Sequence, residues 1–240
     1  MKNDNILVSV VCDVYNHEPY LRQCFDGFVM QKTNFKFEVL VHDDASTDKS
    51  AEIIIEYTNK YPDIFKPIIQ KENQYSKGVG IWKTYQFPRV KGKYVAFCEG
   101  DDYWTDPLKL QSQVDCLEKD KTFSCCFSSV RWVDKSGVKL AGTFPPRQTS
   151  FCLGTITLEV FLKEDFAKGK WSIQLSGFMV RAEVDKTFRR MLRGPLKKYP
   201  FGDYPLFITA FLLGNCYFIG EEMSCYRVMS GGYNLSLIHI

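Results

Sequence analysis

The chain has 240 residues, of which 45% are apolar and 25% are charged, and its formal net charge is +3. This composition excludes an intrinsically disordered chain, a collagen-like chain and a small disulfide-stapled module. The charge is too small to indicate a nucleic-acid partner. The most apolar run, residues 206–213, is far shorter than the roughly 20 residues of a membrane-spanning helix. The length suits one large domain or two small ones.

The N-terminus and the cysteines bear on the cellular compartment. The first five residues, MKNDN, lack the apolar core of a signal peptide. The nine cysteines are scattered and form no Cys-x-x-Cys pair, so they indicate neither a disulfide framework nor a zinc site. The three histidines are too few to indicate a His-based metal site. We therefore expect free thiols in a cytoplasmic protein, either in solution or at the inner face of the cytoplasmic membrane.

The last six residues, 235–240, have the sequence LSLIHI. This sequence resembles the translation of a transposon adapter end that is common in sequencing libraries. We therefore expect a non-native tail over 235–240 and a natural chain cut at about Asn234. The alternative is a genuine strand.

The first half alternates strand and helix patterns. Short β-branched apolar runs predict buried strands at residues 7–12, 37–42, 65–70 and 94–98. Apolar residues at i, i+3 and i+4 predict helices that start near Asn16, near Ser46 or Thr47, and near Pro107 with Thr105 or Asp106 as cap. This alternation predicts an α/β fold with parallel strands and helices on both faces of the sheet.

Acidic residues follow two of the predicted strands directly: Asp43 and Asp44 after the second, and Glu99, Asp101 and Asp102 after the fourth. Ligands of open α/β sheets bind beyond the carboxyl ends of the strands. Clustered carboxylates there repel one another unless a cation such as Mg²⁺ or Mn²⁺ neutralises them, and such a cation can also offset charge on a substrate phosphate. For these acids we favour ligand binding over helix capping.

Phosphate-binding glycine motifs are missing from the sequence. There is no Gly-x-x-x-x-Gly-Lys-Ser/Thr motif, and no Gly-x-Gly-x-x-Gly follows the first predicted strand. For Ser46, Thr47 and Asp106 helix capping is the favoured interpretation.

A set of motifs appears in a characteristic order, each of the acidic ones at a strand end. They are VSVV (8–11), YN (15–16), DDASTD (43–48), EGDD (99–102), YW (103–104), KL (109–110), GDYPLF (202–207) and YR (226–227). In this order the chain resembles a family 2 glycosyltransferase of the bacterial polysaccharide branch, over residues 6–234. The resemblance implies a GT-A (Rossmann-like) fold, an α/β/α sandwich with a mostly parallel central sheet. It also implies one domain, 1–234, with a nucleotide-sugar half at about 1–120 and an acceptor half at about 121–234.

The resemblance implies a donor site at the strand ends. An acid after the second strand binds the base, usually uracil, and either Asp43 or Asp44 fits, because a carboxylate accepts from the ring N–H. Val14, Tyr15 and Asn16 would flank the base, with Tyr15 either stacking on it or packing in the core.

The Asp-x-Asp motif of the family corresponds to Glu99-Gly100-Asp101, with Glu in place of the first Asp. The resemblance implies that this segment binds the donor and a divalent cation, Mn²⁺ or Mg²⁺. We assign the cation chiefly to Asp101, with Asp102 as the alternative ligand. Glu99 is expected to contact either a ribose hydroxyl or the cation.

The second half carries less pattern. It predicts one or two strands at 123–133 with a turn at 134–137, a short helix at 156–162, a strand at 176–180 and a helix at 204–213. Acceptor specificity is expected in 140–171. The resemblance makes Asp203 the general base that deprotonates the acceptor hydroxyl. The alternative is that Asp203 only caps its helix.

Two basic features remain. Arg227 lies in a segment that resembles Tyr-Arg-x-His, with Met229 at the His position, and suits a bidentate contact with the donor diphosphate or a structural ion pair. A second feature is a basic stretch: Lys186, Arg189, Arg190, Arg193, Lys197 and Lys198. It fits a solvated helix face, which we favour, or contact with an anionic membrane or a lipid-diphosphate acceptor.

Together these features predict a metal-dependent, inverting glycosyltransferase. The resemblance implies a nucleotide-sugar donor, UDP-linked, and a glycan or lipid-linked acceptor in capsule, O-antigen or exopolysaccharide assembly. One alternative is a sugar-nucleotide-binding module without activity. The other is a sugar nucleotidyltransferase, which would carry a Gly-rich basic loop where residues 13–17 stand.

Overall fold

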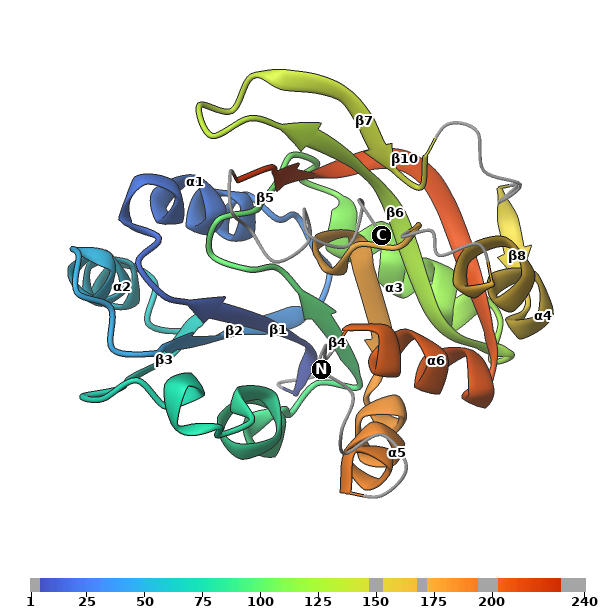
Figure 1. Cartoon of the computed structure of the whole chain (residues 1–240), viewed down its shortest axis with the longest axis horizontal. Helices are drawn as coiled ribbons and strands as arrows, with labels where there is room; N and C mark the ends of the chain where they lie inside the picture. The colour runs from blue at the N-terminus through green and yellow to red at the C-terminus, as the bar shows by residue number, and fades with distance from the viewer. Residues whose placement is uncertain (1–4, 147–152, 168–171, 194–202, 230–240) are drawn as a thin grey trace.

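The computed structural model describes residues 5–146, 153–167, 172–193 and 203–229 (Figure 1). The expected tail at 235–240, as well as Lys197 and Lys198 of the basic stretch, lies outside these residues. No helix within the described ranges is long and apolar enough to cross a membrane.

The described strands form one sheet in the order β3-β2-β1-β4-β9-β6-β10-β5, with β7 beside β6 and β8 beside β10 (Figure 1). Figure 1 shows β6, β7 and β10 as long, curved strands. The strands are β1 (Ile6–Val14), β2 (Lys36–Asp43), β3 (Phe65–Ile69), β4 (Tyr94–Phe97), β5 (Tyr103–Trp104), β6 (Phe123–Val133), β7 (Lys139–Phe144), β8 (Gly154–Ile156), β9 (Phe178–Arg181) and β10 (Asn215–Arg227).

The sheet has a parallel half and a mixed half. β2 pairs in parallel with both β1 and β3, and β1 pairs in parallel with β4, as the strand–helix alternation predicts. β9 then runs antiparallel to both β4 and β6, whereas β6 and β10 are parallel. The predicted α/β fold is confirmed, and the parallel part of the sheet comes from the first half of the chain.

Helices cover both faces of the sheet. They are α1 (Glu18–Val29), α2 (Ser50–Lys60), α3 (Lys109–Lys119), α4 (Leu158–Phe161), α5 (Ala182–Arg193) and α6 (Asp203–Leu213). α1, α2 and α3 share one buried cluster with Val8 and Val10 of β1. α4, α5 and α6 share the other with Val11 of β1 and Phe97 of β4. The two clusters lie on opposite faces because successive side chains of a strand alternate.

The start of α2 differs from the prediction, since neither Ser46 nor Thr47 caps it. The Ser46 hydroxyl donates to Asp43, and the backbone N–H of Thr47 donates to Asn16 Oδ1 at 2.7 Å. Asp48 Oδ1 instead accepts the N–H of Ser50, the first helical residue, at 2.9 Å. The residues expected to cap thus join the loop after β2 to the loop after β1.

The start of α3 agrees partly with the prediction. Asp106 Oδ1 accepts the N–H of Leu108 at 2.7 Å, one residue before the helix begins. Asp106 therefore serves the N-terminus of α3, as expected.

The longest strand, β10, was not predicted. Its pattern is interrupted by Gly220, at φ +89°, and the pairing with β6 shifts register between Phe218 and Glu222. Such a bulge breaks the period of two that identifies a strand in a sequence. β10 also pairs with β5 and β8, and it carries Arg227 to the end of the sheet where the acidic residues lie.

Candidate functional site

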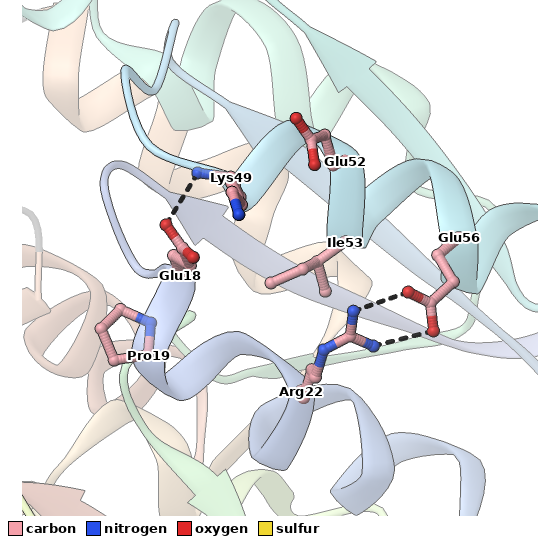
Figure 2. A pocket seen from close by; sticks show the side chains of 7 residues that line it. All are labelled: Glu18, Pro19, Arg22, Lys49, Glu52, Ile53 and Glu56. Atoms are coloured by element: carbon pink, nitrogen blue, oxygen red, sulfur yellow. Dashed lines mark hydrogen bonds and ion pairs between the residues drawn. The ribbon is translucent and has the colours of Figure 1, made fainter.

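A hollow between α1 and α2 does not coincide with the acidic strand ends (Figure 2). Its lining residues are Glu18, Pro19, Arg22, Lys49, Glu52, Ile53 and Glu56. Arg22 donates to both carboxylate oxygens of Glu56, at 2.7 and 2.6 Å, and Glu18 accepts the N–H of Lys49 at 3.0 Å (Figure 2). These contacts join the two helices, and none of the predicted site residues lines the hollow.

The candidate site lies where β1, β2 and β4 end. Backbone hydrogen bonds continue past the strands: the N–H of Asp44 donates to the carbonyl of Val14 at 2.9 Å, and that of Gly100 to the carbonyl of Asp13 at 3.0 Å. The segments after the three strands are therefore neighbours. This is the edge at which ligands bind in parallel α/β sheets.

The loops after β1 and β2 are tied together by polar contacts. Asn16, at φ +55°, donates its N–H to Ser46 Oγ at 2.9 Å. Asp43 is buried and accepts hydrogen bonds from both the N–H and the hydroxyl of Ser46. Burial raises the pKa of Asp43, against the effect of these bonds. Val14 is buried, whereas Tyr15 is 47% exposed, so the Tyr15 ring is not part of the core.

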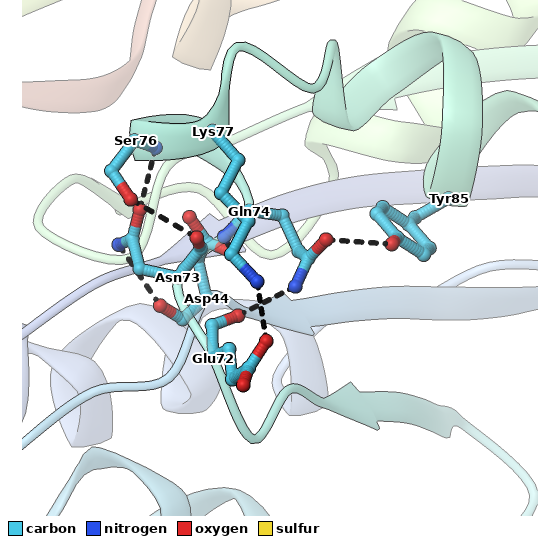
Figure 3. Close-up of polar contacts among 7 residues, drawn as sticks. All are labelled: Asp44, Glu72, Asn73, Gln74, Ser76, Lys77 and Tyr85. Atoms are coloured by element: carbon cyan, nitrogen blue, oxygen red, sulfur yellow. Dashed lines mark hydrogen bonds and ion pairs between the residues drawn. The ribbon is translucent and has the colours of Figure 1, made fainter.

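Asp44 holds the segment that follows β3 (Figure 3). Its two carboxylate oxygens accept the N–H groups of Gln74, at 2.7 Å, and Tyr75, at 3.0 Å. Asn73 donates to the Asp44 carbonyl at 3.1 Å, and Tyr85 donates to Gln74 Oε1 at 3.2 Å (Figure 3). Asp43 and Asp44 are thus both hydrogen-bonded within the protein, each to a different loop.

Gly100 lets the turn after β4 approach α1 closely. A Cβ atom at this position would lie 2.7 Å from His17 Nδ1 and 3.0 Å from Val14 Cγ2. Real Cβ atoms do not approach other heavy atoms this closely, so a larger residue would displace the turn. The glycine therefore sets the position of its neighbours Glu99 and Asp101.

The two aspartates after Gly100 have different surroundings. Asp102 is 1% exposed and accepts hydrogen bonds from the N–H of Arg227, at 2.9 Å, and from Gln174 Nε2, at 3.2 Å. Burial and the charge of Asp101 raise its pKa well above its usual range. Asp101 is only half-buried. Of the two, Asp101 has the more accessible side chain for a ligand.

Asp203 is the first residue of α6, and its charge acts on the turn after β4. Desolvation raises the pKa of Glu99 well above its usual range, and the charges of Asp101 and Asp203 raise it further. Desolvation also raises the pKa of Asp203, to about 7. Both residues nevertheless keep accessible surface. Carboxylates that are surrounded by protein yet reached by solvent are typical of the floor of a binding cleft.

This group of carboxylates can accept a cation. None of the ion pairs among the described residues involves Glu99, Asp101 or Asp203. In the same part of the chain, no three His, Cys, Asp or Glu side chains are placed to hold a metal ion by themselves. A divalent ion held here would take one or two protein carboxylates and complete its shell with substrate phosphates and water.

Asp13 belongs to this region but was not among the predicted residues. Its carboxylate accepts hydrogen bonds from Gln86 Nε2 at 2.7 Å and Trp82 Nε1 at 2.8 Å. Burial raises its pKa to about 6, against these two bonds, and the charge of Asp44 adds to the increase. Asp13 follows an apolar run just as Asp43 and Glu99 do, so the same signal could have identified it.

Arg227, for which the sequence leaves a diphosphate contact and a structural ion pair open, is buried among protein partners. It is 2% exposed, and its Nε donates to the carbonyl oxygen of Asp101 at 2.9 Å. The structure therefore gives this side chain partners within the protein.

The sequence matches a family model and several known proteins. Residues 9–168 match the model described as "Glycosyl transferase family 2". An uncharacterized protein of Mycobacterium tuberculosis is 43% identical over 141 residues, which are 58% of this chain and 39% of that protein. The UDP-Glc:alpha-D-GlcNAc-diphosphoundecaprenol beta-1,3-glucosyltransferase WfaP of Escherichia coli is 31% identical over 142 residues, 58% of this chain and 52% of that protein. The matches thus span about two fifths to one half of these relatives.

Solved structures share the fold. S. aureus TarS 1-349 in complex with UDP-GlcNAc superposes with a TM-score of 0.69 at 19% identity, over 96% of this chain and 61% of that one. The mannosyltransferase PcManGT from Pyrobaculum calidifontis, in complex with GDP-Man and Mn²⁺, superposes with a TM-score of 0.60 at 14% identity, over 95% and 59%. These similarities confirm the predicted GT-A fold.

Proposed function

The chain belongs to glycosyltransferase family 2, and from this premise we propose that it transfers a sugar from a nucleotide-diphosphate donor to a hydroxyl group of a glycan or lipid-linked acceptor. The observation that carries this proposal is that the segments after β1, β2 and β4 meet at one edge of the sheet, where the N–H of Asp44 donates to the Val14 carbonyl at 2.9 Å and that of Gly100 to the Asp13 carbonyl at 3.0 Å. Parallel α/β sheets bind their ligands at this edge, and the attacking hydroxyl needs a base there, for which Asp203 is the candidate.

We assign the donor to the loops after β1, β2 and β4. Tyr15 offers an exposed ring beside these loops, and Asp43 and Asp44 shape the polar surface next to it. The E. coli relative uses UDP-glucose and a diphosphoundecaprenol-linked acceptor, and the S. aureus neighbour binds UDP-GlcNAc. These relatives support a UDP-sugar donor and a role in surface-polysaccharide synthesis. In this scheme residues 1–120 bind the donor and residues 121–234 the acceptor.

Asp101 and Glu99 would hold a divalent cation, Mn²⁺ or Mg²⁺. When bound, the cation neutralises negative charge on the donor diphosphate. The protein's own contribution is the placement of two carboxylates that have no basic partner among the described ion pairs.

Asp203 would act as the general base. The acceptor oxygen attacks the anomeric carbon, the bond from that carbon to the diphosphate oxygen breaks, and the hydroxyl proton passes to the Asp203 carboxylate. Attack from the side opposite the leaving group inverts the anomeric configuration. Because burial raises its pKa to about 7, Asp203 is a stronger base than an ordinary aspartate, and about half of it is ionised at neutral pH.

The experiment that tests this function is a donor panel. The purified chain is incubated with UDP-, GDP- and dTDP-sugars and Mn²⁺, and release of the nucleoside diphosphate is followed. We expect release from at least one donor, its loss on chelation by EDTA, and a decrease of about 100-fold or more in Asp101→Ala. Asp63→Ala, which changes an exposed acid before β3, is the matched control and should keep full activity.

Two results would contradict the proposal. If a nucleotide binds but no donor is consumed, the chain is a sugar-nucleotide-binding module. If pyrophosphate is formed from a sugar phosphate and a nucleoside triphosphate, it is a nucleotidyltransferase.

A further inference from the structure

We infer that Arg227 is a positioning residue that fixes the acidic turn after β4 (Glu99–Asp102) and joins it to the turn between β6 and β7 (residues 134–137). The inference rests on the proposed function in so far as it takes the acidic turn to be the donor site. The contacts that carry it belong to the free protein.

The guanidinium of Arg227 binds three separate parts of the chain. Nε donates to the carbonyl of Asp101 at 2.9 Å. Nη1 donates to the carbonyls of Asp134 and Lys135, both at 3.1 Å. Nη2 donates to Gln23 Oε1 of α1 at 2.9 Å. One side chain at the end of β10 thus connects the donor turn, the β6–β7 turn and α1.

The backbone of Arg227 is held by the same acidic turn. Its N–H donates to Asp102 Oδ1 at 2.9 Å, and Asp102 Oδ2 accepts from Gln174 Nε2 at 3.2 Å. Gln174 Oε1 in turn accepts from the N–H and the hydroxyl of Ser176, at 2.5 and 2.6 Å. The backbone and side chain of Arg227 therefore contact two successive residues of the turn, which restrains both its position and its orientation.

Aromatic rings enclose the guanidinium. Its centre lies 4.4 Å from the ring of Tyr20 and 5.5 Å from that of Tyr103. A buried cation is strongly destabilising unless its N–H groups are hydrogen-bonded, and here four of them have acceptors within the protein. A lysine has three donors on one nitrogen and cannot reach these separate acceptors at once. The site is therefore specific for arginine.

These contacts occupy most of the N–H groups that a contact with the donor phosphate would need. Four of the five guanidinium N–H groups have an acceptor within the protein, which leaves one on Nη2. A bidentate contact with phosphate uses two parallel N–H groups, so it would break at least one of the four bonds. Arg227 therefore acts on the donor through the turn.

The test compares two buried arginines by hydrogen–deuterium exchange without nucleotide. In Arg227→Lys we expect peptides covering 99–104 and 134–138 to exchange at least 10-fold faster than in the wild type. Arg181→Lys is the matched control, because Arg181 is 9% exposed, donates to the carbonyls of Phe123 and Leu117, and lies over the Tyr94 ring. It lies at the amino end of β4, so its loss should leave both turns within 2-fold of the wild type.

A second readout separates positioning from direct contact. Positioning predicts that UDP affinity, measured by calorimetry with Mn²⁺, falls in Arg227→Lys together with the faster exchange of the free protein. Unchanged exchange in the 99–104 peptides would overturn the inference, and a loss of UDP affinity without it would mean direct contact with the donor.

A milder variant covers the case in which Arg227→Lys does not fold. Gln23→Met removes one acceptor and should raise exchange in both turns at least 3-fold, and no rise would overturn the inference. The two proposals can fail separately. If the wild type consumes no donor but both turns exchange faster in Arg227→Lys, the proposed function is contradicted and the positioning role is supported.

Discussion

Asp203 combines the two properties of a general base, a pKa near neutrality and access to solvent. Its pKa of about 7 results mainly from desolvation, opposed by a hydrogen bond from its own backbone. The residue keeps accessible surface although it begins α6. A residue that only capped the helix would have no need of a raised pKa, because the capping interaction favours the charged form.

The substitution Asp203→Asn tests this role. Asparagine has nearly the same size and shape as aspartate, so the fold should be retained, but it cannot accept the proton of the acceptor hydroxyl. We expect sugar transfer to fall by about 100-fold or more, with nucleotide affinity within about 3-fold of the wild type. Transfer is measured with the donor found in the panel, and affinity by calorimetry.

Glu221→Gln is the control for the loss of a negative charge, since Glu221 is exposed on β10. Equal losses of transfer and nucleotide affinity in Asp203→Asn would mean that the residue has a structural role.

At the scale of elements, the connection between β3 and β4 is held to the strand ends by two carboxylates, those of Asp44 and Asp13. Asp44 accepts the N–H groups of Gln74 and Tyr75, and Asp13 binds the side chains of Trp82 and Gln86. Gln86 also donates to the carbonyl of Leu40 at 3.0 Å, so this π-helical turn (Trp82–Gln86) is pinned to β2. The connection is therefore ordered by side chains that lie outside it.

We expect Asp44→Asn to loosen this connection. An amide presents one acceptor oxygen and an NH₂ group, so one of the two N–H groups loses its acceptor and faces a donor. The free energy of unfolding should fall by about 1–3 kcal/mol, measured by urea denaturation.

Asp63→Asn, at an exposed position, should change the free energy of unfolding by less than about 0.5 kcal/mol. If Asp44→Asn is equally neutral, the Asp44 carboxylate does not hold the segment.

At the scale of the whole molecule, a lysine is buried between α3 and the sheet. Lys109 is fully buried, its Nζ lies 4.4 Å from the centre of the Trp104 ring, and it donates to Gln113 Oε1 at 2.7 Å. Desolvation lowers its pKa from 10.5 to about 8. Between pH 8 and 10.5 the folded protein has therefore released a proton that the unfolded chain still binds, so stability increases with pH in this range.

Lys109→Met should remove this pH dependence. Relative to the variant, the wild type should gain up to roughly 3 kcal/mol of unfolding free energy between pH 7 and pH 10.5, measured by urea denaturation. Lys93→Met is the control. Its unfolding free energy should differ from that of the wild type by the same amount at every pH up to about 10, because the ion pair with Glu118 raises the pKa of Lys93. If the unfolding free energies of the wild type and Lys109→Met change with pH in parallel, Lys109 keeps an ordinary pKa.

The local sequence pattern was sufficient to predict the parallel half of the sheet and the acidic residues at its edge. The runs that form β1, β2 and β4 are apolar because both of their faces are buried, and Asp43 and Glu99 follow them directly in the chain. The strand β10 escaped prediction because its bulge interrupts the alternation of apolar and polar residues.

The sequence by itself determined the family, the order of strands and helices in the first half, and the acidic residues at the strand ends, because each depends on neighbours in the chain. Only the tertiary structure decided how those residues are used. Arg227 reaches Asp101 across 126 residues, and the contact of Asp44 with Gln74 crosses 30. Such partners depend on how the strands pack. In the packed structure Asp102 and Arg227 bind each other at the turn, whereas Asp101 remains accessible.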